Sequence, residues 1–123
     1  MKIIIDTHIF LWSLAAPSRI AEQKLNELVA PTNTIYVSSI TIAEMMIKAS
    51  LNKLRIDFDP IKLAEQSGFE LLDFSGREAF LLKDLPFHHR DPFDRMLICQ
   101  SIATGYPVMT DDGTFKLYEC KVM

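Results

Sequence analysis

The chain has 123 residues, of which 49% are hydrophobic and 24% are charged, a composition typical of globular proteins rather than disordered chains. A chain of this length forms one domain with a sizeable core, so we expect residues 1–123 to fold as a single unit. The net charge of -3 argues against a protein that binds nucleic acid through bulk positive charge. A metal-dependent nuclease stays open, because bound cations supply positive charge locally.

The sequence carries no targeting or membrane signal. Its apolar stretches are too short to span a bilayer, and the N-terminal apolar run is broken by Asp6, Thr7 and His8, unlike a signal peptide. Cys99 and Cys120 form neither a C-x-x-C pair nor a metal-binding signature. We therefore expect a cytoplasmic protein in a reducing compartment, with no membrane partner.

The first part of the chain alternates between predicted strands and helices. A strand is expected at residues 3–5, because three β-branched isoleucines follow one another. The spacing of apolar residues predicts a helix over 7–15, which Pro17 ends. Ser18 is the predicted N-cap of the next helix, residues 19–30, whose apolar side chains share one face.

The middle of the chain continues this alternation. The predicted strands are rich in β-branched, aromatic or uninterrupted apolar residues. One short helix is marked by Pro60 at its start and Gly68 at its end. The predicted elements are strands at 35–39 and 69–74 and helices over 40–54, 60–68 and 75–86.

The segment "HHRDPFDRMLICQSIATG" is the clearest helix. Asp91 is its predicted N-cap, Pro92 suits its first turn and Gly105 ends it. A fourth strand is expected at 106–110, and residues 120–123 suggest a fifth at the edge. Strands and helices that alternate from end to end predict an α/β fold with a mostly parallel sheet and helices on both faces.

Acidic residues fall where the strands of such a sheet end or the following helices begin. In open α/β sheets, ligand-binding groups gather outside the carboxyl ends of the parallel strands. Asp6 follows the first strand, and "TDD" follows the fourth. We therefore expect four segments to bring their acids to one rim. These acids are Asp6, Glu44, Asp91, Asp94, Asp111 and Asp112.

Such a cluster suits a bound cation. Like charges close together raise one another's pKa, and a hard divalent cation removes that cost. Mg²⁺ and Mn²⁺ prefer oxygen ligands. One bound ion can activate water for phosphodiester hydrolysis, and a second can stabilise the leaving oxygen. The pattern therefore indicates a metal-dependent phosphodiesterase.

Each acid alone also has an ordinary structural explanation. Asp6 and Asp91 are good helix N-caps, and Asp94 is favoured by the dipole of its helix. Glu44 has the spacing for a helical ion pair with Lys48. No single acid is specific, so the hypothesis rests on their joint placement.

The loop before the long helix holds basic residues that the sequence leaves with two roles. His88 and His89 suit either an exposed loop or a basic surface near RNA. Arg90 and Arg95 suit either contacts with phosphates or neutralisation of the neighbouring aspartates.

At these motifs the chain resembles the PIN domain family, and in particular the VapC-type toxins of bacterial toxin–antitoxin pairs. The resemblance runs through "IIIDTHIFLW", "VSSITIAEMMIK" and "FHHRDPFDRMLICQSIATGYPVMTDDGTF", which together cover nearly the whole chain. Its most specific part is "HHRDPFDR" combined with "MTDD". The resemblance implies a three-layer α/β/α sandwich around a parallel sheet and a ribonuclease that depends on Mg²⁺ or Mn²⁺.

The resemblance also implies the site residues and the reaction. Thr110 matches a supporting hydroxyl, Asp91 is an additional acid that caps its helix near the metal, and Asp111 matches a variable position. The implied reaction is attack of metal-activated water on an RNA phosphodiester. The implied catalytic and metal-ligating acids are Asp6, Glu44, Asp94 and Asp112.

The implied partners are an RNA substrate, a cognate antitoxin protein and a second copy of the chain in a homodimer. An arginine or lysine of the antitoxin would suit a site of four acids. The apolar helix residues 40–51 are a predicted groove for its amphipathic segment.

Two other interpretations stay open. The fold can serve as a non-catalytic RNA- or protein-binding module, whose acids are structural and are capped by Arg, Lys or backbone N–H groups. A metal-dependent phosphatase or phosphoacceptor domain has the same architecture. A receiver domain, however, places an acid pair after the first strand and a lysine at the end of a late strand, and this sequence offers neither.

Overall fold

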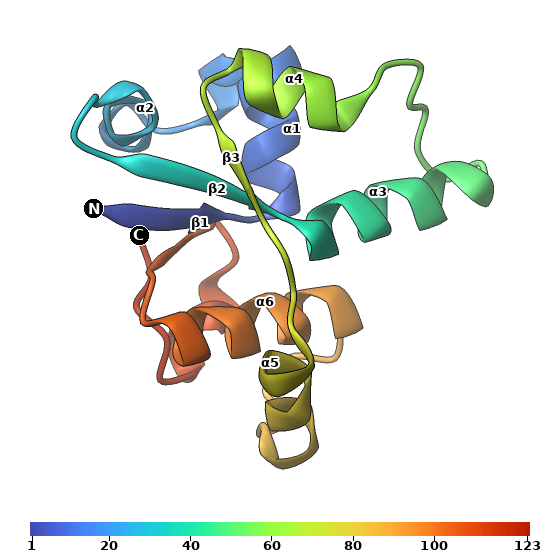
Figure 1. The fold of residues 1–123 in the computed structure, drawn as a ribbon, viewed down its shortest axis with the longest axis vertical. Helices are drawn as coiled ribbons and strands as arrows, with labels where there is room; N and C mark the ends of the chain where they lie inside the picture. The colour runs from blue at the N-terminus through green and yellow to red at the C-terminus, as the bar shows by residue number, and fades with distance from the viewer.

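A four-stranded parallel sheet forms the centre of the computed structural model, which describes residues 1–123. The strands are β1 (Lys2–Ile5), β2 (Thr34–Ser38), β3 (Glu70–Leu72) and β4 (Val108–Met109). They lie in the order β3-β2-β1-β4, so the first strand of the chain has an inner position (Figure 1). Because every pairing is parallel, all four carboxyl ends lie at the same edge of the sheet.

Helices cover both faces of this sheet. The α-helices are α1 (Thr7–Ala15), α2 (Glu22–Val29), α3 (Ser39–Ser50), α4 (Pro60–Gln66), α5 (Gly76–Phe80) and α6 (Pro92–Thr104). Short 3-10 helices are η1 (Pro17–Arg19), η2 (Leu81–Asp84) and η3 (Gly113–Leu117). In Figure 1, α1, α2 and α4 lie on one side of the sheet and α5 and α6 on the other, which confirms the predicted three-layer sandwich. None of the helices combines the length and apolarity needed to cross a bilayer.

The inner strand β1 buries side chains on both faces of the sheet. Ile3 and Ile5 belong to an apolar cluster with Phe10 of α1. Ile4, between them, belongs to a second cluster with Leu97 of α6. Successive strand residues point to opposite faces, so a strand covered on both sides needs an uninterrupted apolar run. The polar residues that follow the run are thereby placed at the edge of the sheet.

The helix α6 begins and ends where the sequence predicts. The side chain of Asp91 accepts hydrogen bonds from the N–H groups of Phe93 (2.9 Å) and Asp94 (3.0 Å). Pro92 occupies the first turn, and Gly105 ends the helix with a φ of 74°, a left-handed conformation that favours glycine. The cap fixes where the first turn of α6 lies, and Asp94 belongs to that turn.

The predicted start of the second helix is wrong. Ser18 lies in η1, and α2 begins at Glu22 after Ala21, whose side chain makes no capping hydrogen bond. Pro17 starts a separate short turn, because its fixed φ suits the first position of a helix. Ile20 then adopts an extended backbone and buries its side chain, which separates the turn from α2.

Several further elements are shorter than predicted, including α3, β3 and β4, which were expected over 40–54, 69–74 and 106–110. The single helix expected over 75–86 divides into α5 and η2, and the guanidinium of Arg95 takes hydrogen bonds to the carbonyls of Leu82 and Leu85. The carbonyl of Leu82 also accepts the N–H of Leu85, which closes η2, and Arg95 donates to the carbonyl of Leu85 that follows. The fifth strand expected at 120–123 is reduced to one parallel bridge, between Val108 and Val122.

Candidate metal centre

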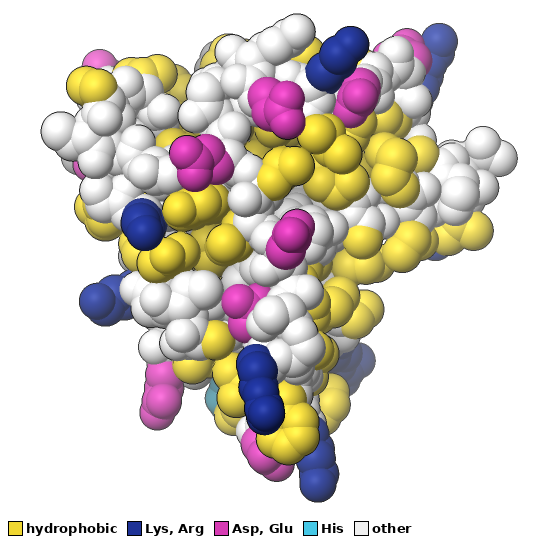
Figure 2. Space-filling model, viewed as in Figure 1, with side chains coloured by type: hydrophobic (Ala, Val, Ile, Leu, Met, Phe, Trp, Pro, Cys, Tyr) yellow, Lys and Arg dark blue, Asp and Glu magenta, His cyan; other side chains and the backbone are white.

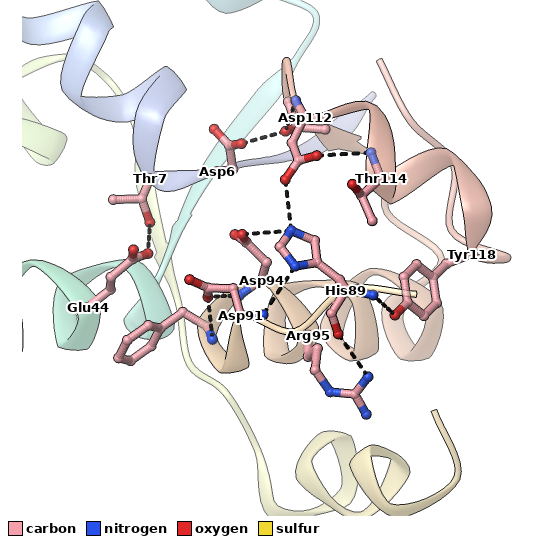
Figure 3. Close-up of polar contacts among 12 residues, drawn as sticks. Asp6, Thr7, Glu44, His89, Asp91, Asp94, Arg95, Asp112, Thr114 and Tyr118 are labelled. Atoms are coloured by element: carbon pink, nitrogen blue, oxygen red, sulfur yellow. Dashed lines mark hydrogen bonds and ion pairs between the residues drawn. The ribbon is translucent and has the colours of Figure 1, made fainter. Parts of the chain in front are cut away.

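Acidic side chains from four segments lie at the edge of the sheet where the strands end. Asp6 follows β1, and Asp112 follows β4. Glu44 lies on α3, and Asp94 lies in the first turn of α6. Figure 3 shows Asp6, Asp94 and Asp112 around the side chain of His89, with Glu44 beside them. The fold therefore brings the four predicted acids to the same edge.

His89 contacts two of these aspartates. Its Nε2 is 2.7 Å from Oδ2 of Asp112 and 3.0 Å from Oδ2 of Asp94. One ligand atom from each of these three residues lies within 4.8 Å of the other two. Asp94, Asp112 and His89 are therefore the most compact set of metal-ligating atoms in the molecule, and we call them the central triad.

Thr110 connects Asp6 to this triad. The hydroxyl of Thr110 donates to Oδ2 of Asp6 over 2.5 Å and accepts the N–H of Asp112 over 3.0 Å. The other carboxylate oxygen of Asp6 caps α1 by accepting the N–H of Ile9 (2.9 Å). Burial raises the pKa of Asp6, whereas these hydrogen bonds from Thr110 and Ile9 lower it. Thr110 thus bonds both Asp6 and the backbone of Asp112, and Asp6 also has a structural role as a helix cap.

Glu44 has partners for both carboxylate oxygens. Thr7 donates to Oε1 over 2.6 Å, and Lys48 contacts Oε2 over 2.5 Å. This contact is the helical ion pair that the spacing predicts. The side chain of Glu44 is buried, but its oxygens lie outside the central triad. Glu44 nevertheless lies close enough to contribute to the raised pKa of Asp94.

Asp94 carries the strongest electrostatic cost in the site. Burial first, and then the negative charge of Asp91, raise the pKa of Asp94 to about 7, and His89 acts in the opposite direction. No lysine, arginine or backbone N–H contacts its carboxylate, which has His89 as its sole polar partner. No lysine or arginine of the protein therefore neutralises the negative charge of Asp94.

Asp112 shows the opposite behaviour. Burial raises its pKa, but the hydrogen bonds from the N–H of Thr114 and from His89 outweigh burial and lower the pKa overall. Two adjacent carboxylates of the central triad therefore differ in their readiness to ionise. Such a difference is common at functional sites, because catalysis and metal binding both need defined charge states.

The remaining predicted acids lie at the border of the site. Asp91 caps α6, as predicted, and its charge raises the pKa of Asp94. Asp111 forms an ion pair with Lys24 of α2, whose ammonium group also donates to the carbonyl of Thr110 over 2.8 Å. Asp111 is thus occupied by a surface lysine and stays outside the central triad.

His89 and its supporting residues are the part of the site that the sequence analysis missed. His88 is exposed, whereas the side chain of His89 is only 14% exposed and points into the acidic cluster. Neither suggested role of Arg95 is found: its buried guanidinium contacts no aspartate and instead donates to carbonyls of the preceding loop, among them Pro86 (2.8 Å). The "HHRDPFDR" motif was the available signal, but it did not distinguish one histidine from the other.

The residues of the triad fit a hard divalent cation. Asp94 and Asp112 offer carboxylate oxygens, which are the ligands that Mg²⁺ and Mn²⁺ prefer. Burial first, and then the charges of neighbouring acids, raise the pKa of Asp94, and a bound cation would offset this cost. Asp6 and Glu44 are placed to add ligands directly or through water.

Comparisons with known proteins agree with this architecture. The family described as PIN domain matches residues 3–119. Comparison with curated protein sequences gives no match.

Solved structures share the fold at low sequence identity. A chain of VapBC2 from Rickettsia felis, bound to a DNA fragment from their promoter, is 20% identical with a TM-score of 0.72, and the match covers 100% of this chain and 98% of that one. DNA-bound VapBC from Salmonella typhimurium gives 22% identity and a TM-score of 0.64, with coverage of 100% and 97%. VapBC-5 from Mycobacterium tuberculosis, a member of the VapBC family of toxin–antitoxin systems, is 18% identical with a TM-score of 0.57. The match covers 99% of this chain and 95% of that one. Since the family match spans almost the whole sequence, the chain belongs to the PIN domain family.

Proposed function

We propose that this PIN domain is a VapC-type ribonuclease toxin that hydrolyses RNA phosphodiesters with the help of Mg²⁺ or Mn²⁺. The observation that carries the proposal is the state of Asp94. A purely structural acid would be capped by a lysine, an arginine or a backbone N–H, and the Asp94 carboxylate has none of these while other acids crowd it. This arrangement favours a metal site over the alternative of a non-catalytic binding module.

We assign the metal to Asp94 and Asp112, with Asp6 and Glu44 completing the site. A bound divalent ion would supply an activated water for attack on phosphorus and would neutralise the charge that develops on the phosphate. Thr110 holds Asp6, and Thr7 and Lys48 hold Glu44, so these two acids are already oriented. Asp91 keeps the first turn of α6 in place, and Asp111 takes no part.

The solved structures with this fold that carry the names VapBC support the toxin part of the proposal, because one of those names states a toxin–antitoxin system. We infer that the chain also binds an antitoxin. The predicted groove at 40–51 is only partly available, since Ile40 and Met45 are buried in the core. Exposed apolar side chains gather over α3 and α4 (Figure 2), and they include Met46, Ile47, Leu51 and Ile61.

Cleavage of a mixed RNA pool tests the proposal. The chain, purified free of any antitoxin, is incubated with RNA and either Mn²⁺ or EDTA. We expect cutting that needs Mn²⁺ and that falls by at least about 100-fold in Asp6→Asn and Asp94→Asn, because the ion contributes several kcal/mol. Asp57→Asn is the matched control, since Asp57 is exposed and pairs only with Arg55.

Three results separate the interpretations. Cutting that survives both site substitutions would assign the activity to a contaminant or to another site. Wild type that binds Mn²⁺ but cuts no RNA in the pool would limit the proposal to a narrow substrate. Wild type that neither binds Mn²⁺ nor cuts RNA would favour the non-catalytic binding module.

A further inference from the structure

The imidazole of His89 lies between the two carboxylates of the central triad, which raises the question of whether it is a metal ligand. This question rests on the proposed function, because it concerns the same site. The hydrogen bond of the ring's other nitrogen gives the answer. Nδ1 of His89 accepts the backbone N–H of Asp91 over 3.2 Å. An acceptor nitrogen carries no proton, so in the neutral ring the proton lies on Nε2.

This single Nε2–H is hydrogen-bonded to Asp112, and Asp94 makes a second, ion-pair contact with the same nitrogen. It lies 2.7 Å from Oδ2 of Asp112 and 3.0 Å from Oδ2 of Asp94. For Nε2 to bind a metal, the proton would have to move to Nδ1, where it would face the N–H of Asp91 instead of a lone pair. The ring is therefore arranged to donate. Oδ1 of Asp94 has no hydrogen bond and is free to bind a cation.

The backbone around His89 is fixed by two buried side chains from elsewhere in the chain. The N–H of His89 donates to the hydroxyl of Tyr118 over 2.8 Å, and that hydroxyl donates to the carbonyl of Pro86 over 2.7 Å. Arg95 donates to the same carbonyl over 2.8 Å. The ring itself packs edge-on against Phe115. His89 thus cannot turn away without breaking several contacts at once.

We propose that His89 is a positioning residue of the metal centre and not one of its ligands. Through its hydrogen bond to Asp112 and its contact with Asp94, the ring holds two carboxylates at a separation at which one cation can reach both. Folding then brings the two carboxylates together despite their repulsion, so the site is already arranged before the ion binds. Hydrogen bonds from groups outside the ligand set commonly have this effect on metal affinity.

Calorimetric titration with Mn²⁺ tests this role without relying on RNA cleavage. We expect His89→Ala to bind Mn²⁺ about 10- to 100-fold more weakly than wild type. We expect His89→Gln to keep most of the affinity, because the glutamine amide can donate from nearly the position of Nε2. Asp57→Asn is again the control, since Asp57 is exposed and pairs only with Arg55.

Two spectroscopic measurements distinguish a donor from a ligand. In pulsed electron paramagnetic resonance of wild type with Mn²⁺, we expect no nitrogen bound directly to the metal. In the metal-free protein at mildly alkaline pH, we expect nitrogen NMR to place the proton of His89 on Nε2. The NMR measurement uses the wild-type protein without metal or RNA, so its result does not depend on whether the variants fold.

Several outcomes would overturn the inference. A nitrogen bound directly to Mn²⁺ would show that His89 is a metal ligand. A proton on Nδ1 would show that Nε2 does not donate to the aspartates. Equal Mn²⁺ affinity in wild type and His89→Ala would remove its positioning role while leaving the ribonuclease proposal intact. A glutamine variant as weak as the alanine variant would remove the donor role. Wild type that binds no Mn²⁺ would overturn both the inference and the proposed function.

Discussion

At the scale of single residues, the main property of the site is that Asp94 resists ionisation. Its pKa of about 7 follows from burial and from the charge of Asp91. In the unfolded chain the same carboxyl has an ordinary pKa of about 4. A proton and a metal cation therefore compete for this side chain, because each neutralises its charge.

This shift predicts how stability depends on pH in the presence of a chelator. Between about pH 4 and about pH 7, the folded protein binds more protons at Asp94 than the unfolded chain does, so this residue makes the free energy of unfolding decrease as pH rises. Above about pH 7, Asp94 is ionised in both states, so its unfavourable contribution to the free energy of unfolding no longer changes with pH. We therefore expect Asp94→Asn to gain stability relative to wild type as pH rises from about 5 to about 8.

Urea denaturation at the two pH values measures the difference. Comparison with Asp94→Asn isolates this residue, because Asp112, with its lowered pKa, contributes a dependence of the opposite sign at lower pH. A constant difference between wild type and variant at both pH values would show that Asp94 titrates normally.

At the scale of secondary structure, α6 depends on the cap that also borders the metal centre. Asp91 supplies two hydrogen bonds to the first turn and a negative charge beside Asp94. Two substitutions separate these effects. Asp91→Ser removes the charge and keeps a capping oxygen, whereas Asp91→Ala removes both.

We expect Asp91→Ala to be about 1 kcal/mol less stable than Asp91→Ser, which is the usual contribution of a helix N-cap. Chemical denaturation of the two metal-free variants gives this difference directly. Equal stability would mean that Pro92 and the packing of α6 define the start of the helix without the cap.

The elements also show which parts of the molecule could be predicted from the sequence. Asp91, Pro92 and Gly105 act locally, so the ends of α6 could be read from the chain. The N-cap predicted at Ser18 was wrong because the position of a cap depends on where the backbone turns into the helix. Here the buried, extended Ile20 sets that position. Local patterns therefore identify an element better than they identify its first residue.

The residues of the site also divide into those that could be predicted from the sequence and those that could not. Asp6 and Asp112 could be predicted because strands of a parallel sheet share one carboxyl edge. The role of His89 could not, because it depends on Tyr118, a residue 29 positions away, and on Arg95 beneath the loop. The contact between Lys24 and Asp111 spans 87 positions and has no local signature either.

At the scale of the whole molecule, cation binding should be linked to folding. An ion that binds the folded state alone adds about 2.7 kcal/mol to the free energy of unfolding when its free concentration is about 100 times its dissociation constant. We expect Mn²⁺ to stabilise wild type and Asp57→Asn in this way, and to leave Asp94→Asn nearly unchanged. Thermal denaturation with and without Mn²⁺ tests this, and equal stabilisation of all three would place the bound ion elsewhere.

The surface offers separate apolar areas for the proposed antitoxin and for the second copy of the chain that the resemblance implies. Leu81, Ile102 and Leu117 line one pocket of about 450 Å³ beside α6, whereas Leu51 is exposed at the end of α3. We expect Leu117→Glu to convert a homodimer to monomers while it still binds antitoxin. Leu51→Glu should have the reverse effect.

Light scattering and antitoxin co-purification measure the two properties. Both leucines are well exposed, so neither substitution should unfold the protein. A monomeric wild type would contradict the homodimer that the resemblance implies, and loss of antitoxin binding in Leu117→Glu alone would exchange the roles of the two surfaces.

The hydrogen bond between Thr110 and Asp6 has a consequence for the order of folding. It joins residues 104 positions apart, and β4 can pair with β1 only after nearly the whole chain is available. Contacts of such long sequence separation form slowly, because the intervening chain must be ordered first. A chain still in synthesis holds Asp6, Glu44 and Asp94 without Asp112, so the proposed nuclease would become active only once its last acid arrives.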